Sequence, residues 1–131
     1  MEITVTNEMA KVPVTVFKMS GNLTEEEVLM AEVRNQYDAG MRYALLDLSN
    51  VKYISSSGLR AFHGTFTLLR GDGPEESDEA IAKGIARGTY VSPHLKLFKP
   101  SKEAMKTLRI SGYDMFLEVF KKYKDAINSF G

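Results

Sequence analysis

The feature that most constrains the fold is a short apolar run near the middle of the chain. Residues 43–48, Tyr-Ala-Leu-Leu-Asp-Leu, contain a single charged side chain. A strand with one face in water alternates apolar and polar residues, whereas a strand covered by helices on both faces is almost continuously apolar. The run therefore predicts a central strand of an α/β sheet.

A helix is predicted shortly after this strand. Three hydroxyl residues, Ser55, Ser56 and Ser57, precede Gly58, and serine is a preferred residue at a helix N-cap. We expect at least one of the three serines to cap the helix. Apolar residues then recur at spacings of three and four, which places them on one helix face: Leu59, Phe62, Phe66 and Leu69.

The N-terminal third of the chain predicts a β-hairpin followed by a helix. Residues 2–6 and 12–16 each alternate apolar with other side chains, the pattern of half-buried strands, and a turn separates them. Thr24 and Glu27 have the spacing of a capping box. We therefore expect Thr24 to cap a helix that ends near Gly40.

Residues 71–93 interrupt this regular pattern. They contain four glycines, two prolines and an acidic run, and the segment is far longer than the ~4–6 residues that usually connect two elements. Ile81 and Ile85 have helical spacing, but Gly84 and Gly88 argue against a helix there. We expect residues 71–93 to form a mobile insertion.

The remaining residues complete an alternating order of strands and helices. Residues 95–98 predict a short strand, and Ser101 is expected to cap a third helix that ends at Gly112. Residues 115–120 are consistent with a short edge strand, and residues 123–130 predict a last helix. The order predicts one α/β domain over the whole chain, with a mixed sheet of four to five strands and about four helices.

Composition excludes several classes of function. Lys plus Arg and Asp plus Glu both number 17, so the basic excess that phosphate binding by nucleic-acid-binding proteins requires is missing. No segment approaches the ~18 apolar residues of a membrane span, and the first residues do not form a secretory signal. The absence of cysteine rules out disulfides and thiolate metal sites. We expect a cytoplasmic protein that binds neither nucleic acid nor membrane.

The segment from residue 45 to 59, Leu-Leu-Asp-Leu-Ser-Asn-Val-Lys-Tyr-Ile-Ser-Ser-Ser-Gly-Leu, resembles the central motif of STAS domains. These are the anti-sigma-factor antagonists and their relatives in stressosomes and anion transporters. Residues 21–24, Gly-Asn-Leu-Thr, are similar to the family's Gly-x-Leu-Asp turn, and residues 95–101 are similar to its fourth strand and following turn. The order of these landmarks covers nearly the whole chain outside the insertion, so the resemblance implies a STAS-type fold.

The resemblance also implies a function. The family's serine directly before Gly-Leu is phosphorylated by a partner kinase, and that position here is Ser57. A helix N-terminus suits an anion, because its free N–H groups and positive dipole end face the charge. The implied partner is an anti-sigma factor with serine-kinase activity or a related regulatory protein. The implied partner-binding residues come from the turn at residues 21–24 and from the segment around Ser57: Asn22, Thr24, Tyr53, Ser55, Ser56, Ser57, Gly58, Leu59, Arg60 and His63.

Two positions depart from the family pattern, and other functions stay open. Ser55 stands where an acidic residue is common, and Thr24 stands where the turn usually ends in Asp. The chain is alternatively a scaffold without a phosphorylation switch, which uses the acidic insertion as its contact element, or a ligand-sensing subunit of a regulatory assembly. A homodimer is also left open.

Enzymatic activity is not expected. Ser57 lacks the preceding glycine of a Gly-x-Ser-x-Gly nucleophile elbow. The two histidines, His63 and His94, do not have metal-ligand spacing with other ligand residues. We therefore expect no catalytic residues, no metal and no cofactor.

Overall fold

The computed structural model describes residues 1–71 and 76–131, and within them the strands form one sheet in the order β1-β2-β3-β4-β5. The strands are β1 (Glu2–Met9), β2 (Pro13–Leu23), β3 (Ala44–Ile54), β4 (Leu95–Phe98) and β5 (Val119–Phe120). The β1–β2 hairpin is antiparallel and the other three pairs are parallel, so the sheet is mixed, as predicted. The expected edge strand within residues 115–120 is only two residues long.

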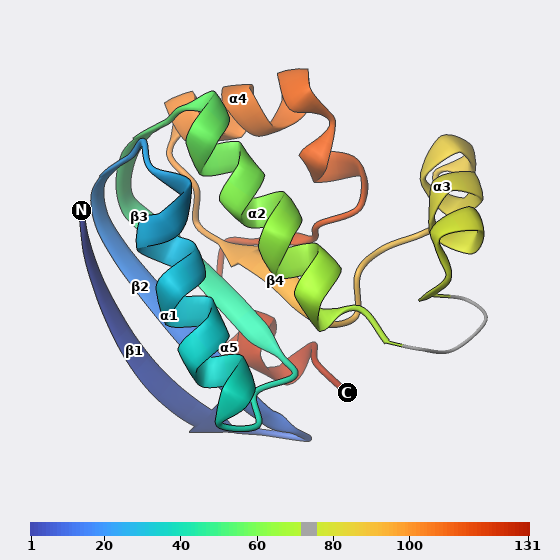
Figure 1. Cartoon of the computed structure of the whole chain (residues 1–131), viewed down its shortest axis with the longest axis horizontal. Coiled ribbons are helices and arrows are strands. Elements are labelled where there is room, and N and C mark those ends of the chain that lie inside the picture. Colours follow the sequence, from blue (N-terminus) through green and yellow to red (C-terminus); the bar gives the residue numbers. More distant parts are fainter. Residues whose placement is uncertain (72–75) are drawn as a thin grey trace.

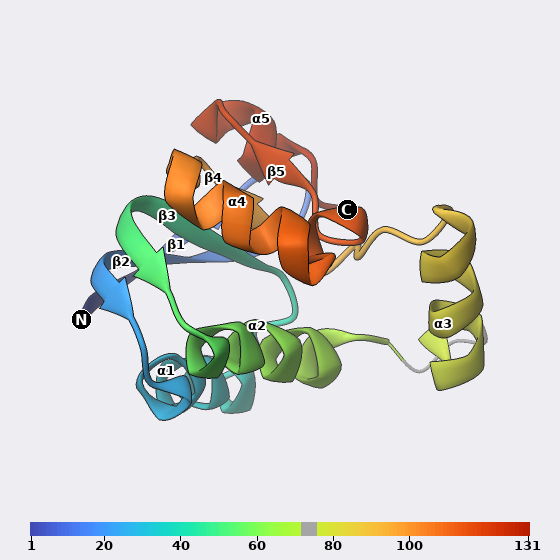
Figure 2. The ribbon, with the colours of Figure 1, turned by 90° about the horizontal axis from the view of Figure 1, so that it is seen from above.

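Helices cover both faces of this sheet. They are α1 (Glu26–Asp38), α2 (Ser56–Leu69), α3 (Asp78–Arg87), α4 (Lys102–Ser111) and α5 (Tyr123–Asn128), with a short 3-10 helix at Tyr113–Met115. Helices α1 and α2 lie side by side under one face, and α5 lies on the opposite face (Figure 2). Each face has its own buried cluster, which explains why the central strand β3 is apolar on both sides.

The predicted cap of the first helix is wrong. Helix α1 begins at Glu26 with Glu25 at the N-cap, and no side chain accepts a capping hydrogen bond there. The reason is that β2 continues to Leu23, which pairs with Ile54 of β3. Thr24 therefore belongs to the turn after this strand, and the helix begins one residue later than the capping-box spacing predicts. Thr24 is exposed at this turn.

The insertion contains a helix where the glycines argued against one. Ser77 caps α3 by accepting from Ala80 N at 3.1 Å, and Gly88 ends it in the left-handed region at φ +71°. Gly84 permits close packing, because an added Cβ would lie 2.5 Å from Cβ of Tyr90. Figure 1 shows α3 standing out beyond the C-terminal end of α2. Residues 72–75 of the predicted insertion lie outside the described residues, and the mobility of the segment stays a prediction.

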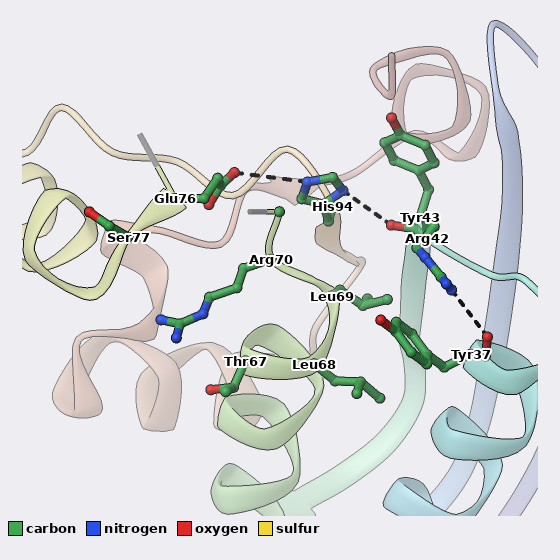
Figure 3. Close-up of a pocket in the computed structure, with 11 residues that line it drawn as sticks. Tyr37, Arg42, Tyr43, Thr67, Leu68, Leu69, Arg70, Glu76, Ser77 and His94 are labelled. Atoms are coloured by element: carbon green, nitrogen blue, oxygen red, sulfur yellow. Dashed lines mark hydrogen bonds and ion pairs between the residues drawn. The ribbon is translucent and has the colours of Figure 1, made fainter. Parts of the chain in front are cut away.

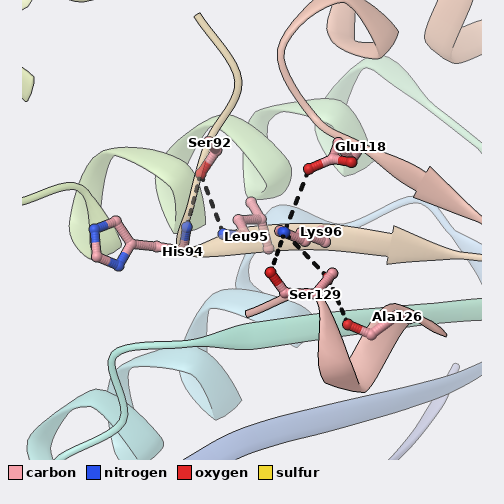
Figure 4. Close-up of polar contacts among 7 residues, drawn as sticks. All are labelled: Ser92, His94, Leu95, Lys96, Glu118, Ala126 and Ser129. Carbon is pink, nitrogen blue, oxygen red and sulfur yellow. Dashed lines mark hydrogen bonds and ion pairs between the residues drawn. The ribbon is translucent and has the colours of Figure 1, made fainter. Parts of the chain in front are cut away.

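A buried lysine attaches the C-terminal helix to the sheet. Lys96 of β4 is 5% exposed, and its Nζ donates to the backbone carbonyl and to Oγ of Ser129, each at 3.1 Å (Figure 4). Glu118 forms an ion pair with the same nitrogen at 3.3 Å, and the ring of Phe130 lies 4.9 Å away. Burial of the charge is offset by these partners, so β4 and α5 are held together across the second cluster.

Candidate functional site at the N-terminus of α2

Ser55 is the serine that caps α2, which confirms the prediction that one of the three would do so. Its Oγ accepts a hydrogen bond from Gly58 N at 3.1 Å. Its own backbone N–H donates to the carbonyl of Leu23 at 2.9 Å. Ser55 therefore joins the start of α2 to the end of β2, and a carboxylate is not needed at this position for the helix to be capped.

Gly58 allows α2 to pack directly against the end of β2. An added Cβ would lie 2.4 Å from the carbonyl oxygen of Leu23 and 3.0 Å from Cγ2 of Ile54. No side chain fits without displacing the helix or the strand. Gly58 is buried, and Leu59 is partly buried against the main core. These two predicted partner-binding residues therefore position the surface around Ser57 more than they form it.

Ser57 lies in the first turn of α2 and is half-buried. Its Oγ accepts a hydrogen bond from Nη2 of Arg60 at 2.7 Å. Nε of the same arginine lies 3.3 Å from Oε1 of Glu26 in α1, so one guanidinium connects the hydroxyl to a carboxylate. The first N–H groups of a helix have no partner within it, and they add positive potential on the same side. The Ser57 hydroxyl therefore lies at the positive end of the α2 dipole, beside a guanidinium that is also paired with Glu26.

The other predicted residues surround this turn. Asn22 and Tyr53 are register partners at the ends of β2 and β3, and both are exposed. Thr24 follows β2, while Ser56 and His63 lie on α2, and these three are also exposed. The structure thus brings the predicted set to one end of the molecule. Sequence reasoning missed Glu26, which reaches Arg60 across 34 positions, a separation without a local sequence signal.

A second polar site lies at the opposite end of α2. A pocket of about 870 Å³ is lined by the ends of α1 and α2 and by residues on either side of the undescribed segment (Figure 3). Oε1 of Glu76 lies 3.8 Å from Nε2 of His94, and Oε2 accepts from the hydroxyl of Tyr90 at 2.7 Å. Burial, followed by the hydrogen bond to Glu76, raises the pKa of Tyr90. Arg70, directly after α2, forms an ion pair with Asp78 of α3.

These polar groups hold the insertion against the domain. His94 also lies within 3.2 Å of the carbonyl of Arg42 through Nδ1, and the Arg42 guanidinium lies 3.9 Å above the ring of Tyr37. Each charged group in this pocket already has a partner from the chain. Over residues 1–71 and 76–131, no group of three or more His, Cys, Asp and Glu side chains could hold a metal ion, and no helix could span a membrane.

Comparison with solved structures identifies the fold. An anti-sigma factor antagonist from Mycobacterium paratuberculosis superposes with a TM-score of 0.62 at 19% identity, over 98% of this chain and 93% of that one. The phosphorylated form of the Bacillus cell fate determinant SpoIIAA superposes with a TM-score of 0.58 at 18% identity, over 95% and 97% of the two chains. The chain has the SpoIIAA-like fold of STAS domains.

The same fold is also found in a protein that is not named as an anti-sigma factor antagonist. An uncharacterised DUF3478-family protein with a SpoIIAA-like fold from Shewanella loihica superposes with a TM-score of 0.54 at 15% identity, over 98% of this chain and 93% of that one. No model of a known protein family matches the sequence, and no curated protein does either. Because a likeness in fold at these identities does not determine function, the function of this chain has to be argued from its site.

Proposed function

We propose that this chain is a regulatory protein-interaction module of the anti-sigma-factor-antagonist type, controlled by phosphorylation of Ser57. The observation that supports the proposal is the position of the Ser57 hydroxyl, which lies at a helix N-terminus and within 2.7 Å of the Arg60 guanidinium. A cytoplasmic anti-sigma factor with serine-kinase activity is the proposed partner. Its contact surface is the set of exposed residues around the start of α2.

The local electrostatics favour a phosphate on Ser57 within the domain itself. Phosphoserine carries about −1.5 to −2 charges at neutral pH, and its oxygens are strong acceptors. Arg60 already donates to the hydroxyl oxygen, so the phosphate would compete with Glu26 for the same guanidinium. The fold would therefore tolerate the modification while the link between α1 and α2 changes.

The consequence of phosphorylation falls on the partner. A dianion placed at the centre of a protein interface has to lose its hydration, and acidic groups of the partner would repel it. The phosphate on Ser57 alone then decides whether the partner is bound: the unmodified module binds it and the phosphorylated module releases it. Unfolding of the domain is not required.

Three variants test this switch. Wild type, Ser57→Asp, Ser57→Ala and the control Ser56→Asp are immobilised side by side and exposed to cytoplasmic lysate from the source organism, and retained proteins are identified by mass spectrometry. Ser56 is the neighbouring exposed hydroxyl, so its substitution adds the same charge one residue away. We expect a partner kept by wild type, Ser57→Ala and Ser56→Asp to be lost by Ser57→Asp. Equal retention by wild type and Ser57→Asp, with unchanged circular dichroism, contradicts the proposal.

A scaffold without a switch is the second candidate, favoured by the position of α3. This helix stands out from the domain (Figures 1 and 2). Its exposed residues include Asp78, Glu79 and Lys83. Deleting residues 72–92 separates the two functions. Loss of partner retention on deletion, together with full retention by Ser57→Asp, supports the scaffold.

A further inference from the structure

A shallow pocket of about 480 Å³ lies between the turn after β4, helix α4 and strand β5. It shares no lining residue with the pocket beside α3. Three of its lining residues are cationic, three are apolar and none is acidic: Lys99, Arg109 and Lys121, with Pro100, Met105 and Val119. The whole chain has equal numbers of acids and bases, so this lining is a local departure from the composition.

The cations of this pocket are not neutralised by the protein. The ion pairs formed by residues 1–71 and 76–131 involve other cations, and neither Lys99, Arg109 nor Lys121 takes part in one. In the pocket beside α3, by contrast, Arg70 and His94 each face a carboxylate. Like charges that converge without a counter-ion repel one another, and a bound anion relieves that repulsion.

Lys99 has a backbone conformation that its residue type disfavours. Among the described residues it is the one non-glycine with a positive φ, at +50°. A long side chain is strained there, and the following Pro100 further disfavours helical conformations at this position. The strain is maintained by β5, because the Lys99 N–H donates to the carbonyl of Phe120 at 2.8 Å. Glycine or asparagine would fit this backbone more easily, so the presence of lysine points to a use for its side chain.

The pocket lies at the edge where parallel strands end. Lys99 directly follows β4, and Ser101 then caps α4 by accepting from Ala104 N at 3.1 Å. The pocket therefore lies beyond the carboxyl end of β4 and beside β5. The volume is also in the range of small-molecule sites, and Met105 is a side chain that adapts to apolar ligands.

We propose that this pocket binds a small organic phosphate, with the phosphate on Lys99, Arg109 and Lys121 and an apolar group against Met105 and Val119. Arginine supplies a planar pair of donors that matches phosphate oxygens, and the lysines add compact positive charges. A dianion is favoured over a neutral or singly charged ligand because three cationic side chains line the pocket. Ser57 is not among the residues that line this pocket, so a ligand there would give the module an input besides phosphorylation.

Titration of the full chain followed by ¹H–¹⁵N NMR tests the site at constant ionic strength. The probes are phenyl phosphate, inorganic phosphate and phenol. We expect phenyl phosphate to shift the amides of Lys99, Val119 and Lys121, and to bind on the order of tenfold more tightly than inorganic phosphate, because only the former fills the apolar part. Phenol should not bind measurably. Equal affinity for phenyl phosphate and inorganic phosphate overturns the assignment.

Variants separate a specific site from general attraction. Arg109→Gln and Lys121→Gln should each weaken phenyl phosphate about fivefold or more, since each removes a charged donor. Lys106→Gln removes the same charge from an exposed α4 position outside the lining, and should leave affinity nearly unchanged. Lys99→Asn should weaken binding while raising thermal stability, because asparagine tolerates a positive φ. Equal losses in all four variants would instead indicate a diffuse surface charge, and would overturn the proposal.

Discussion

Substitution of Gly58 by alanine tests how α2 is positioned. The new Cβ would lie 2.4 Å from the carbonyl oxygen of Leu23, whereas ordinary contacts begin at 3.4 Å, so helix and strand must separate by about 1 Å at this point. The atom in the way is backbone and cannot rotate aside. Cγ2 of Ile54 and Cγ of Leu23, each at 3.0 Å, restrict movement in other directions.

The energetic cost follows from three contributions. Overpacking of a tight contact costs about 1–3 kcal/mol. Moving the helix also lengthens the hydrogen bond from Ser55 N to the same carbonyl, now 2.9 Å, which is worth about 1 kcal/mol. The higher helix propensity of alanine offsets about 1 kcal/mol. We therefore expect Gly58→Ala to lower the free energy of unfolding by about 1–3 kcal/mol, and the melting temperature by roughly 4 °C per kcal/mol.

Gly64→Ala is the matched control in the same helix. Its added Cβ would meet Sδ of Met30 at 3.0 Å and Cε at 3.2 Å, the flexible end of a side chain that can move aside. We expect its free energy of unfolding to stay within about 1 kcal/mol of wild type, because the propensity gain and the small displacement oppose each other. Urea unfolding of the three proteins measures both effects. A Gly58→Ala protein as stable as Gly64→Ala refutes the close approach of α2 to β2.

Two further predictions concern the C-terminal helix. Burial, and after it the hydrogen bond to Glu8, raises the pKa of Tyr123. The neutral side chain therefore contributes its full stabilisation below the ordinary tyrosine pKa of about 10. This contribution is lost as the pH rises through the raised pKa of the folded state. The free energy of unfolding measured by urea at about pH 8 and about pH 11 should therefore fall less for Tyr123→Phe than for wild type, and an equal fall contradicts the shift. Lys96→Met should cost about 1–2 kcal/mol because it removes the donor to two Ser129 oxygens, whereas the exposed Lys122→Met should cost less than about 0.5 kcal/mol in the same assay. Equal stability of the two lysine variants would show that Lys96 does not hold α5.

Local patterns predicted the elements well where neighbouring residues alone decide the conformation. The caps at Ser55 and Ser101, the hairpin of β1 and β2, and the strand at residues 95–98 each follow from side chains within a few positions. The apolar run at residues 43–48 correctly indicated a strand covered on both faces. The start of α2 at the three serines was also predictable, because helix capping depends on near neighbours.

Predictions were less accurate where a distant partner decides the outcome. Strand β3 extends to Ile54, because residues 49–54 find hydrogen-bond partners at the end of β2, and that same pairing moves the start of α1 past Thr24. Helix α3 forms despite Gly84, which instead provides the space that Tyr90 occupies. Both outcomes depend on contacts between segments that are separate in the sequence.

The sequence by itself therefore determined the order of elements outside residues 71–93, the α/β class and the serine turn that opens α2, since periodicity and capping depend on near neighbours. Tertiary structure alone decided which charges meet. Arg60 joins Ser57 to Glu26 of another helix, whereas Lys99, Arg109 and Lys121 come from three segments to line one pocket that has no acidic lining residue. The physical reason is that electrostatic environment depends on distance in space, and only the packing of helices against the sheet determines that distance.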